Sequence, residues 1–318
     1  MSLGEFDIIE RFFASHASRS DVRLGIGDDS AVLDVPAHHK LVLAMDTVVE
    51  GVHFLPNSDA FDIGYRALAV NLSDIAAMGA VPSWMSLSLA LPDANADWLQ
   101  QFAAGLFALA DEHDVQLIGG DTVRGPLVIT VQVGGWIEPD RWLTRSGAKP
   151  GDVLFVSGSL GDAAAGLELI RTEHPRNPAT NYLRERFERP QPRVALGRKL
   201  RSFASAAMDV SDGLIADVGK LCKSSACGVT IDADSVPLSQ ALRDSFPIER
   251  ALHYALTGGD DYELVFTVPE HLVAQLSTVE VAITRIGVVD ERPGVRCNGS
   301  SGPITFAAGG YDHFASSR

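Results

Sequence analysis

Aspartates recur beside glycine or serine, or directly after apolar runs, at six places in the chain. The six places are Asp28–Asp29, Asp46, Asp74, Asp121, Asp209 with Asp212, and Asp260–Asp261. Most carboxylates of a folded protein lie in solvent, but the neighbours of these are small and apolar. Carboxylates at the edge of a core repel one another and are costly to desolvate, and hard oxygen ligands suit Mg²⁺ or Mn²⁺. The pattern therefore predicts a shared divalent-metal site.

Each aspartate taken alone also has a simpler interpretation. Asp46 could form a turn at a strand end, Asp121 could be a turn residue, and Asp212 could cap the helix expected to follow it. Asp74 fits such a role least well, because it lies inside a predicted helix, where Asp is a poor helix former. It is one turn beyond Asn71, on the same face. Six such sites in one chain favour metal binding over six separate local roles.

Several standard catalytic signatures are missing from the sequence. It contains no GxxxxGK[ST], HExxH or GxSxG motif. Residues 25–30 begin like a dinucleotide loop, but the third glycine is missing and two acids would face a pyrophosphate. Residues 43–48 are similar to the nucleophile strand of haloacid-dehalogenase phosphatases, but the second Asp of that motif is absent. The sequence therefore nominates metal ligands and no acid–base catalytic residue, with His53 as the one histidine close after a candidate ligand.

The elements that must position these residues alternate between strands and helices. Strands are predicted over residues 40–46, 83–91, 115–118, 127–133, 153–156, 206–210, 229–231, 262–268 and 283–289. Helices are predicted over 62–78, 97–113, 162–171 and 194–203 and from 213 onward. The Pro-rich stretch 175–192 predicts a solvated loop with some helix. This alternation indicates an α/β or α+β protein, and Pro and Gly residues within 138–152 predict a boundary between domains 1–138 and 139–318.

Length and charge limit the remaining classes. A chain of 318 residues is long enough for two domains. With 26 Lys and Arg against 41 Asp and Glu, the net charge is −15, so we expect no nucleic-acid or membrane-surface partner. No apolar run approaches the roughly 18 residues of a membrane span, and the acidic start has no signal-peptide pattern. The three cysteines form no CxxC pair. We expect a cytoplasmic protein.

Eight segments, taken together and in order, resemble thiamine-monophosphate kinase. They are residues 25–29, 46–54, 71–80, 118–122, 145–152, 209–214, 258–263 and 310–314. The resemblance as a whole runs from residue 4 to residue 314, and the eight segments in order are far more specific than any one motif. It implies the fold of the aminoimidazole-ribonucleotide-synthetase-related superfamily, with an N-terminal α/β domain that pairs across a homodimer into a β-barrel and a C-terminal α+β domain.

The resemblance also implies a reaction and a set of site residues. The implied reaction transfers a phosphoryl group from ATP to thiamine monophosphate, giving ADP and thiamine diphosphate, with several Mg²⁺ ions. The implied Mg²⁺ ligands are Asp29, Asp46, Asp74, Asp121, Asp209 and Asp212, with the Met45 carbonyl as a further ligand. The implied ATP contacts are Gly120, Asp121, Arg145 and Ser211, and the implied thiamine-phosphate contacts are His53, Asp260 and Tyr311. Tyr311 could instead be a C-terminal core aromatic.

Two residues depart from the family pattern. Ala44-Met45-Asp46 stands where the family commonly has Ser-Thr-Asp, so a hydroxyl ligand is lost at Ala44. Asp260 stands where the family has Glu, and its side chain is one methylene shorter.

The implied chemistry suits these residues, because an acidic pocket can hold two phosphorylated substrates only with cations. A phosphate nucleophile with a pKa near 6 is largely deprotonated and needs no general base. Two alternatives stay open. One is another ATP-dependent superfamily member with a different acceptor, although selenophosphate synthetases need a reactive residue near the N-terminus and this chain has no Cys before Cys222. The other is a non-catalytic thiamine-phosphate-binding protein or maturation scaffold.

Overall fold

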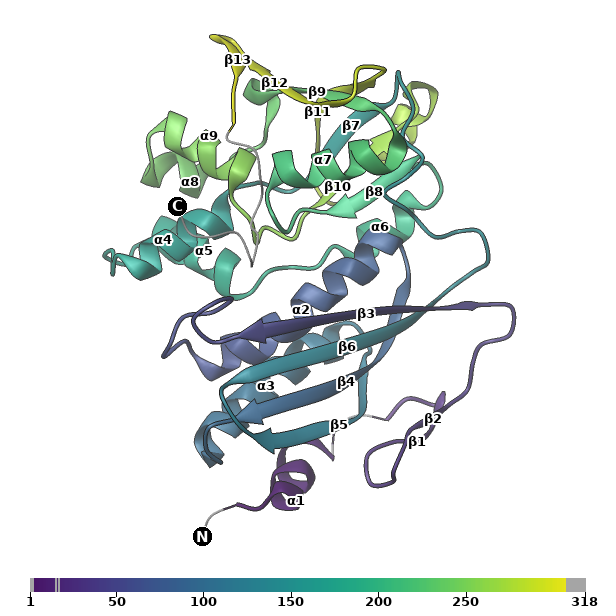
Figure 1. Ribbon diagram of the computed structural model, residues 1–318, viewed down its shortest axis with the longest axis vertical. Coiled ribbons are helices and arrows are strands. Elements are labelled where there is room, and N and C mark those ends of the chain that lie inside the picture. Colours follow the sequence, from purple (N-terminus) through teal and green to yellow (C-terminus); the bar gives the residue numbers. More distant parts are fainter. Residues whose placement is uncertain (1–2, 15, 17, 307–318) are drawn as a thin grey trace. The chain divides into compact units, whose positions relative to one another are not determined.

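The computed structural model describes residues 3–14, 16 and 18–306. The chain forms two compact units: an N-terminal unit of Met1–Ile75 with Ala80–Arg141, and a C-terminal unit of Ala76–Gly79 with Trp142–Arg318. Together they give the expected mixture of helices and strands (Figure 1). Across the described residues, no helix combines the length and apolarity that a membrane crossing requires.

The N-terminal unit is built on a four-stranded sheet. Its strands lie in the order β3 (Lys40–Val49), β6 (Val128–Ile137), β4 (Val81–Leu91) and β5 (Gln116–Arg124). The pairs β3–β6 and β6–β4 are antiparallel and β4–β5 is parallel, so β3 and β5 are the two edges. The chain before the sheet forms α1 (Glu5–Ile8), η1 (Ile9–Phe13), β1 (Val22–Leu24) and β2 (Val32–Leu33).

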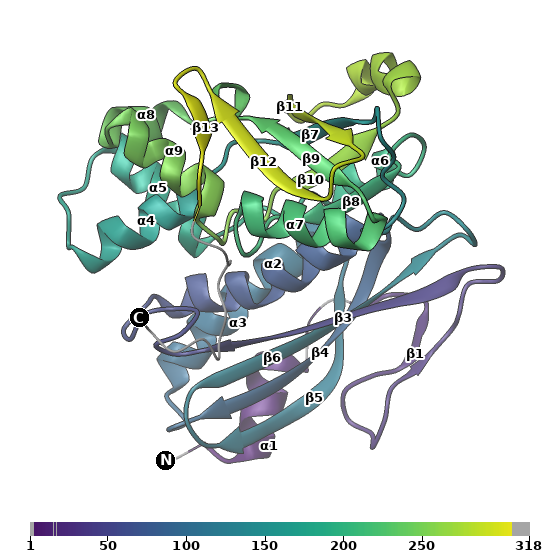
Figure 2. The same ribbon diagram turned by 45° about the horizontal axis from the view of Figure 1, so that its top comes forward.

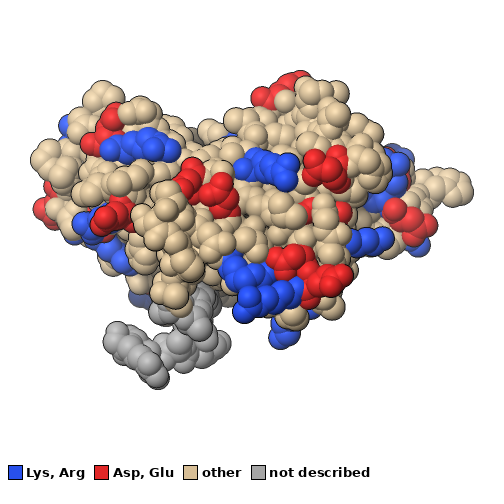
Figure 3. All heavy atoms as spheres, turned by 90° about the horizontal axis from the view of Figure 1, so that it is seen from above, with Lys and Arg blue, Asp and Glu red and all other residues tan. Residues whose placement is uncertain are grey.

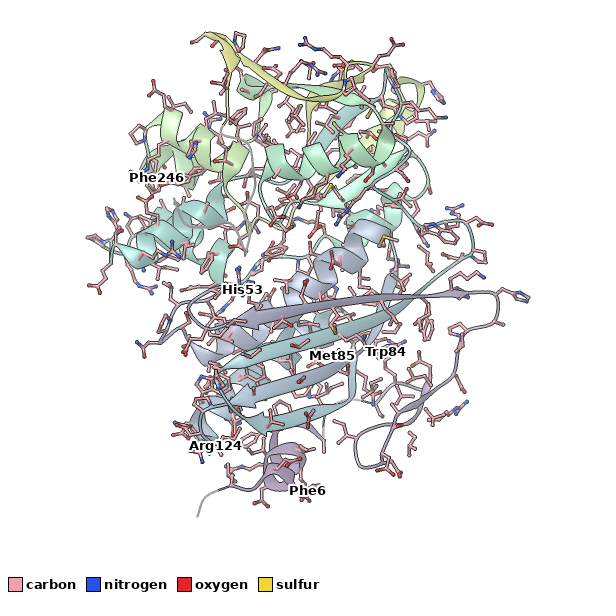
Figure 4. All side chains as sticks on the ribbon, in the orientation of Figure 1. Phe6, His53, Trp84, Met85, Arg124 and Phe246 are labelled. Atoms are coloured by element: carbon pink, nitrogen blue, oxygen red, sulfur yellow. The ribbon has the colours of Figure 1, made fainter. Side chains whose placement is uncertain are left out.

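Two long helices, α2 (Ala60–Met78) and α3 (Ala96–Glu112), cover one face of this sheet (Figures 1 and 2). Their backbones approach closely, because a Cβ on Gly64 would lie 2.1 Å from the Phe102 carbonyl oxygen and one on Gly105 would lie 1.9 Å from that of Phe61. Only glycine permits this crossing. Consecutive residues of a strand point to opposite faces of the sheet. Trp84 and Met85 are such neighbours on β4 (Figure 4), and Met85 is the one that is completely buried on the helix-covered face.

The C-terminal unit contains a seven-stranded sheet. Its order is β13 (Gly302–Ile304), β12 (Gly294–Gly299), β9 (Gly228–Asp232), β11 (Ile283–Asp290), β7 (Val153–Ser157), β10 (Leu264–Val268) and β8 (Ala206–Asp209). All neighbours are antiparallel except β12 and β9. The helices are α4 (Asp162–Arg171), α5 (Pro178–Glu188), α6 (Val194–Leu200), α7 (Leu214–Ser225), η2 (Ala233–Ser235), α8 (Gln240–Ser245), α9 (Ile248–Thr257) and η3 (Glu270–Thr278). On the face shown in Figure 3, acidic and basic side chains lie interspersed.

Three local predictions are wrong. The strand predicted to end at residue 46 continues to Val49, because β6 pairs with it along its whole length. Asp121 lies inside β5 and not in a turn, because β4 pairs with it up to Arg124. In the stretch 175–192 the expected helix is confirmed as the eleven-residue α5, but the stretch is not a solvated loop, because α5 buries Leu183 and Phe187. The predicted helices α2, α3 and α4 are confirmed to within two residues at each end.

Candidate functional site

Asp46 and Asn71 form a polar cluster of the N-terminal unit, and Asp74 lies one turn further along α2. Asp46 points toward the helix-covered face of β3, and its backbone N–H donates to Oδ1 of the completely buried Asn71 over 2.9 Å. Asn71 is fixed in turn, because its Nδ2 donates to the Ala67 carbonyl over 3.0 Å. Asp74 follows Asn71 by one turn of α2, so both lie on one face of that helix. Burial raises the pKa of Asp46, which marks it as a carboxylate that a nearby cation would stabilise.

His53 lies just beyond the end of β3 (Figure 4). The ring Nδ1 of His53 accepts a hydrogen bond from the Val49 backbone N–H over 3.1 Å. The backbone N–H of His53 donates to the Val49 carbonyl over 2.9 Å. With Nδ1 accepting, the ring proton of the neutral imidazole lies on Nε2. His53 therefore offers a donor at Nε2. Asp29, between β1 and β2, is exposed.

Gly120 and Asp121 lie on β5, away from the polar cluster around Asp46. Asp121 pairs with Ser88, which pairs with Thr130, and Thr130 Oγ1 lies 2.7 Å from Thr47 Oγ1. Residues opposite one another in a ladder share a face, so Asp121 and Thr47 lie on the face of the sheet that α2 and α3 leave open. Asp46, the next residue on β3, points to the other face. A single chain therefore does not bring Asp46 and Asp121 together in its sheet.

The open face of the sheet is apolar at its β3 edge. Leu41, Leu43 and Met45 alternate along β3 and are 49%, 52% and 63% exposed. On β5, Val123 is 48% exposed. Large apolar side chains grouped on one sheet face are typical of a surface that another protein covers.

In the C-terminal unit, Ser211 and Asp212 are held by the first turns of α7. The Asp217 carboxylate, completely buried, accepts the N–H groups of both residues at Oδ2, each over 2.9 Å. Lys220 bridges Asp212 and Asp217, with Nζ 2.7 Å from Asp217 Oδ1. Burial raises the pKa of Asp217. Burial alone would lower the pKa of Lys220, but its two carboxylate partners outweigh burial and raise it.

This arrangement corrects the interpretation of Asp212 as a helix cap. Asp212 does not cap α7: the N-cap is Gly213, at φ 109°, and no side chain caps there. Asp209 ends β8 and is buried, opposite Leu264 of β10. Arg145 is exposed, and its carbonyl accepts from the Ser225 hydroxyl over 3.0 Å.

Asp260 lies in the segment Gly258–Glu263, which runs beside Val210 and Ser211. The Asp260 N–H donates to the Ser211 carbonyl, and the Tyr262 N–H donates to that of Val210, each over 2.9 Å. Within the C-terminal unit, the structure therefore brings Ser211 and Asp260 together. Tyr311 lies outside the described residues.

Asp261, grouped with Asp260 among the candidate metal residues, is instead completely buried and accepts the Gly161 and Ala163 N–H groups at the start of α4. Three residues of these segments were not singled out from the sequence: Asp217, Lys220 and Glu263. Asp217 carried a weak signal, since it is an acid inside an apolar helix five residues after Asp212. The others make contacts that only the fold creates. Across the described residues, no group of three or more His, Cys, Asp or Glu side chains is placed to hold a metal ion. The candidate ligands therefore occur singly or in pairs within each unit.

Comparisons with known proteins agree with these motifs. The family models described as AIR synthase related protein, N-terminal and C-terminal domain, match residues 27–137 and 149–299. The chain is 47% identical to the thiamine-monophosphate kinase of Salmonella typhimurium, over 99% of both chains. Its fold matches a thiamine-monophosphate kinase structure from Stenotrophomonas maltophilia K279a at 46% identity, TM-score 0.88, covering 94% of this chain and 98% of the other. It also matches AaThiL complexed with AMPPCP and TMP, at 35% identity, TM-score 0.80, covering 91% and 92%. The chain thus belongs to the thiamine-monophosphate kinase family, with the two-domain α/β fold of AIR synthase related proteins.

Proposed function

We propose that this protein transfers the γ-phosphoryl group of ATP to thiamine monophosphate, releasing ADP and thiamine diphosphate. The observation that carries this proposal is similarity over 99% of both chains to proteins called thiamine-monophosphate kinase. A relative has been solved with AMPPCP, an ATP analogue, together with TMP. This relative therefore binds an analogue of the donor assigned here together with TMP.

The proposed nucleotide contacts are Gly120, Asp121, Arg145 and Ser211. The Asp217 carboxylate accepts the backbone N–H of Ser211 and so fixes this backbone. The Ser211 hydroxyl therefore extends from a rigid turn. Gly120 has φ 156°, and a Cβ there would lie 1.8 Å from the Leu87 carbonyl oxygen. Glycine is therefore required here, because the backbone of β4 occupies the place that a side chain would take.

The proposed Mg²⁺ ligands are Asp29, Met45, Asp46, Asp74, Asp121, Asp209 and Asp212. The donor set fits a hard cation, because it consists of carboxylates and one carbonyl. Mg²⁺, when bound, would neutralise charge on the phosphates and orient them. Asn71 holds the Asp46 backbone in place, and Lys220 offsets part of the negative charge of Asp212 and Asp217.

The proposed acceptor contacts are His53, Asp260 and Tyr311. The acceptor phosphate needs no base, because its second pKa is near 6. The described residues of this chain then have to bind and orient the acceptor, and no residue has to remove a proton. His53, with a donor at Nε2, suits a phosphate oxygen. Asp260 suits the cationic or amino-bearing part of thiamine.

We further propose that residues 1–138 form a metal- and ATP-binding dimerisation domain, and 139–318 the C-terminal domain. The exposed Leu41, Leu43 and Met45 and the unpaired edges of β3 and β5 support pairing with a second copy.

Asp46 and Asp121 are separated by three strand spacings, about 14 Å, and lie on opposite faces. We therefore assign Asp121 to the site of the partner copy. Leu43→Lys should give a monomer in light scattering and lose activity, whereas Ile248→Lys, exposed at the start of α9 and outside this sheet, should do neither. A monomeric wild type would contradict the dimer.

A coupled assay for ADP release tests the function itself. Thiamine monophosphate, thiamine and an aminoimidazole precursor are compared as acceptors at saturating ATP. We expect turnover with thiamine monophosphate and negligible turnover with the other two. Equal turnover with thiamine would contradict the base-free reaction, and turnover with the aminoimidazole precursor alone would indicate a different superfamily activity. Binding of thiamine monophosphate without ADP release would indicate a non-catalytic protein.

A further inference from the structure

The segment Gly258–Glu263 alternates between half-buried and fully buried side chains. Asp260 and Tyr262 are half-buried, whereas Asp261 and Glu263 are completely buried. Asp260 has φ 70° and Tyr262 has φ 51°. Both are in the left-handed region, which non-glycine residues rarely adopt. Two such residues in one short segment require surrounding contacts that hold the backbone in place.

Asp261 supplies the first of these contacts. Its Oδ2 accepts the Gly161 N–H over 2.6 Å and its Oδ1 accepts the Ala163 N–H over 3.2 Å. These are donors at the start of α4, whose N-cap Gly161 offers no side chain. Asp261 thus caps α4 from a distance of 100 residues in sequence, and α4 in turn fixes Asp261.

Glu263 supplies the second contact. Arg193 binds its carboxylate with two nitrogens, Nε over 2.7 Å and Nη2 over 2.5 Å. Arg186 donates to Oε1 over 2.9 Å, and the Ser157 hydroxyl donates to Oε2 over 2.5 Å. A Cβ on Gly158 would lie 2.3 Å from Oε1, so a glycine leaves room for this carboxylate.

The same groups hold the backbone of the segment. Arg186 Nη2 donates to the Asp261 carbonyl over 3.2 Å, and the Val210 N–H donates to the Glu263 carbonyl over 2.8 Å. A buried ionic cluster is weak evidence for stability, because well-packed apolar residues often serve as well. What this cluster supplies is a single fixed conformation of the segment Gly258–Glu263. In that conformation the Asp260 carboxylate accepts a hydrogen bond from the Tyr262 hydroxyl over 3.3 Å.

We propose that Asp261 and Glu263, clamped by Arg186 and Arg193, are positioning residues that set the direction of Asp260 toward the acceptor. This proposal rests on the proposed function, in which Asp260 contacts thiamine monophosphate. The side chains of the cluster act through the backbone of the segment. Their removal should therefore weaken acceptor recognition only as long as Asp260 is present.

A double-mutant cycle tests this. Arg193→Lys keeps the positive charge but loses the two-nitrogen contact with Glu263. It is a milder change than Glu263→Gln, and Glu263→Gln is a second test of the same contact if that variant folds. We expect Arg193→Lys to raise the KM for thiamine monophosphate about fivefold to tenfold and the KM for ATP less than twofold. In an Asp260→Ala background, the same change should raise the acceptor KM less than twofold. Calorimetric binding of thiamine monophosphate should repeat this pattern.

The control is Arg296→Lys, which removes another Arg–carboxylate ion pair of the same unit, in which Arg296 Nη2 lies 2.6 Å from both Asp290 oxygens. It should lower the melting temperature without changing the acceptor KM. The proposal is overturned if Arg193→Lys lowers the melting temperature alone, or raises the acceptor KM equally with and without Asp260. A wild-type protein that releases no ADP with thiamine monophosphate would instead contradict the proposed function, and the calorimetric cycle would still test the positioning.

Discussion

The two units hold their candidate site residues in different ways. In the N-terminal unit, Asp29, Met45 and Asp121 are exposed, and the contact that fixes Asp46 is to its backbone. In the C-terminal unit, Ser211 and Asp260 belong to segments fixed by fully buried carboxylates and their cationic partners.

This difference suggests a division of tasks. Carboxylates that lie at the surface of the N-terminal unit keep oxygen atoms available for metal ions. Segments that several buried hydrogen bonds hold in place keep their substrate-binding side chains in one geometry. Changes in the N-terminal unit should therefore affect activity more than stability, and changes in the buried cluster of the C-terminal unit should affect stability as well.

The largest effect is expected for Asp74→Asn. Asn keeps the size of the side chain and removes its charge, so α2 should fold while turnover falls by orders of magnitude. Asp97→Asn, on the exposed first turn of α3, is the control and should leave turnover unchanged. Steady-state kinetics with a melting curve check both. Near-normal turnover of Asp74→Asn at saturating Mg²⁺ and ATP would remove Asp74 from the set of ligands.

Glu263→Gln should have the largest effect on stability. It leaves the Arg186 and Arg193 guanidinium groups without their buried carboxylate, and breaking a buried ion pair costs roughly 3–5 kcal/mol. Urea unfolding measures the loss. Asp121→Asn, on an exposed strand position, should change the free energy of unfolding by no more than about 0.5 kcal/mol. Equal losses in the two variants would contradict the contrast between the units.

Asp260→Ala should raise the KM for thiamine monophosphate about tenfold and leave the KM for ATP nearly unchanged. The shorter Asp could reach the acceptor through a bridging water, at an ordering cost of up to about 2 kcal/mol. Loss of binding in ground and transition states together leaves kcat less affected. If Asp260 only closes its turn, the variant will melt at a lower temperature and keep its acceptor KM.

The smallest effect concerns pH. Burial, with the nearby Asp162, raises the pKa of Asp261 to about 8. Between its usual pKa near 4 and that value, the folded state keeps a proton that the unfolded state has released. This group therefore lowers stability as pH rises through the window. The melting temperature of Asp261→Asn should fall less than that of wild type between pH 5 and 8. Parallel curves would show that Asp261 does not titrate there.

The sequence was most informative where local pattern decides structure. The periodicity of α2 placed Asp74 inside a helix, and the motif order identified the family. Pairing with β6 carries β3 past Asp46, and pairing with β4 carries β5 through Asp121, and no local signal indicates either extension. The roles of Asp261 and Glu263 depend on partners 100 and 106 residues away. Contacts of this kind arise only when β7, β10 and α4 come together, so spacing along the chain does not reveal them.

The central claim is that protein-held metal ions, beyond the one that accompanies ATP, make this acidic site able to transfer a phosphoryl group. The most direct test varies Mg²⁺ at fixed, saturating ATP and thiamine monophosphate and measures the initial rate of thiamine diphosphate formation. We predict that the rate continues to rise after Mg²⁺ exceeds ATP, and that Asp74→Asn abolishes this further rise. A rate that reaches its maximum at one Mg²⁺ per ATP would contradict the claim.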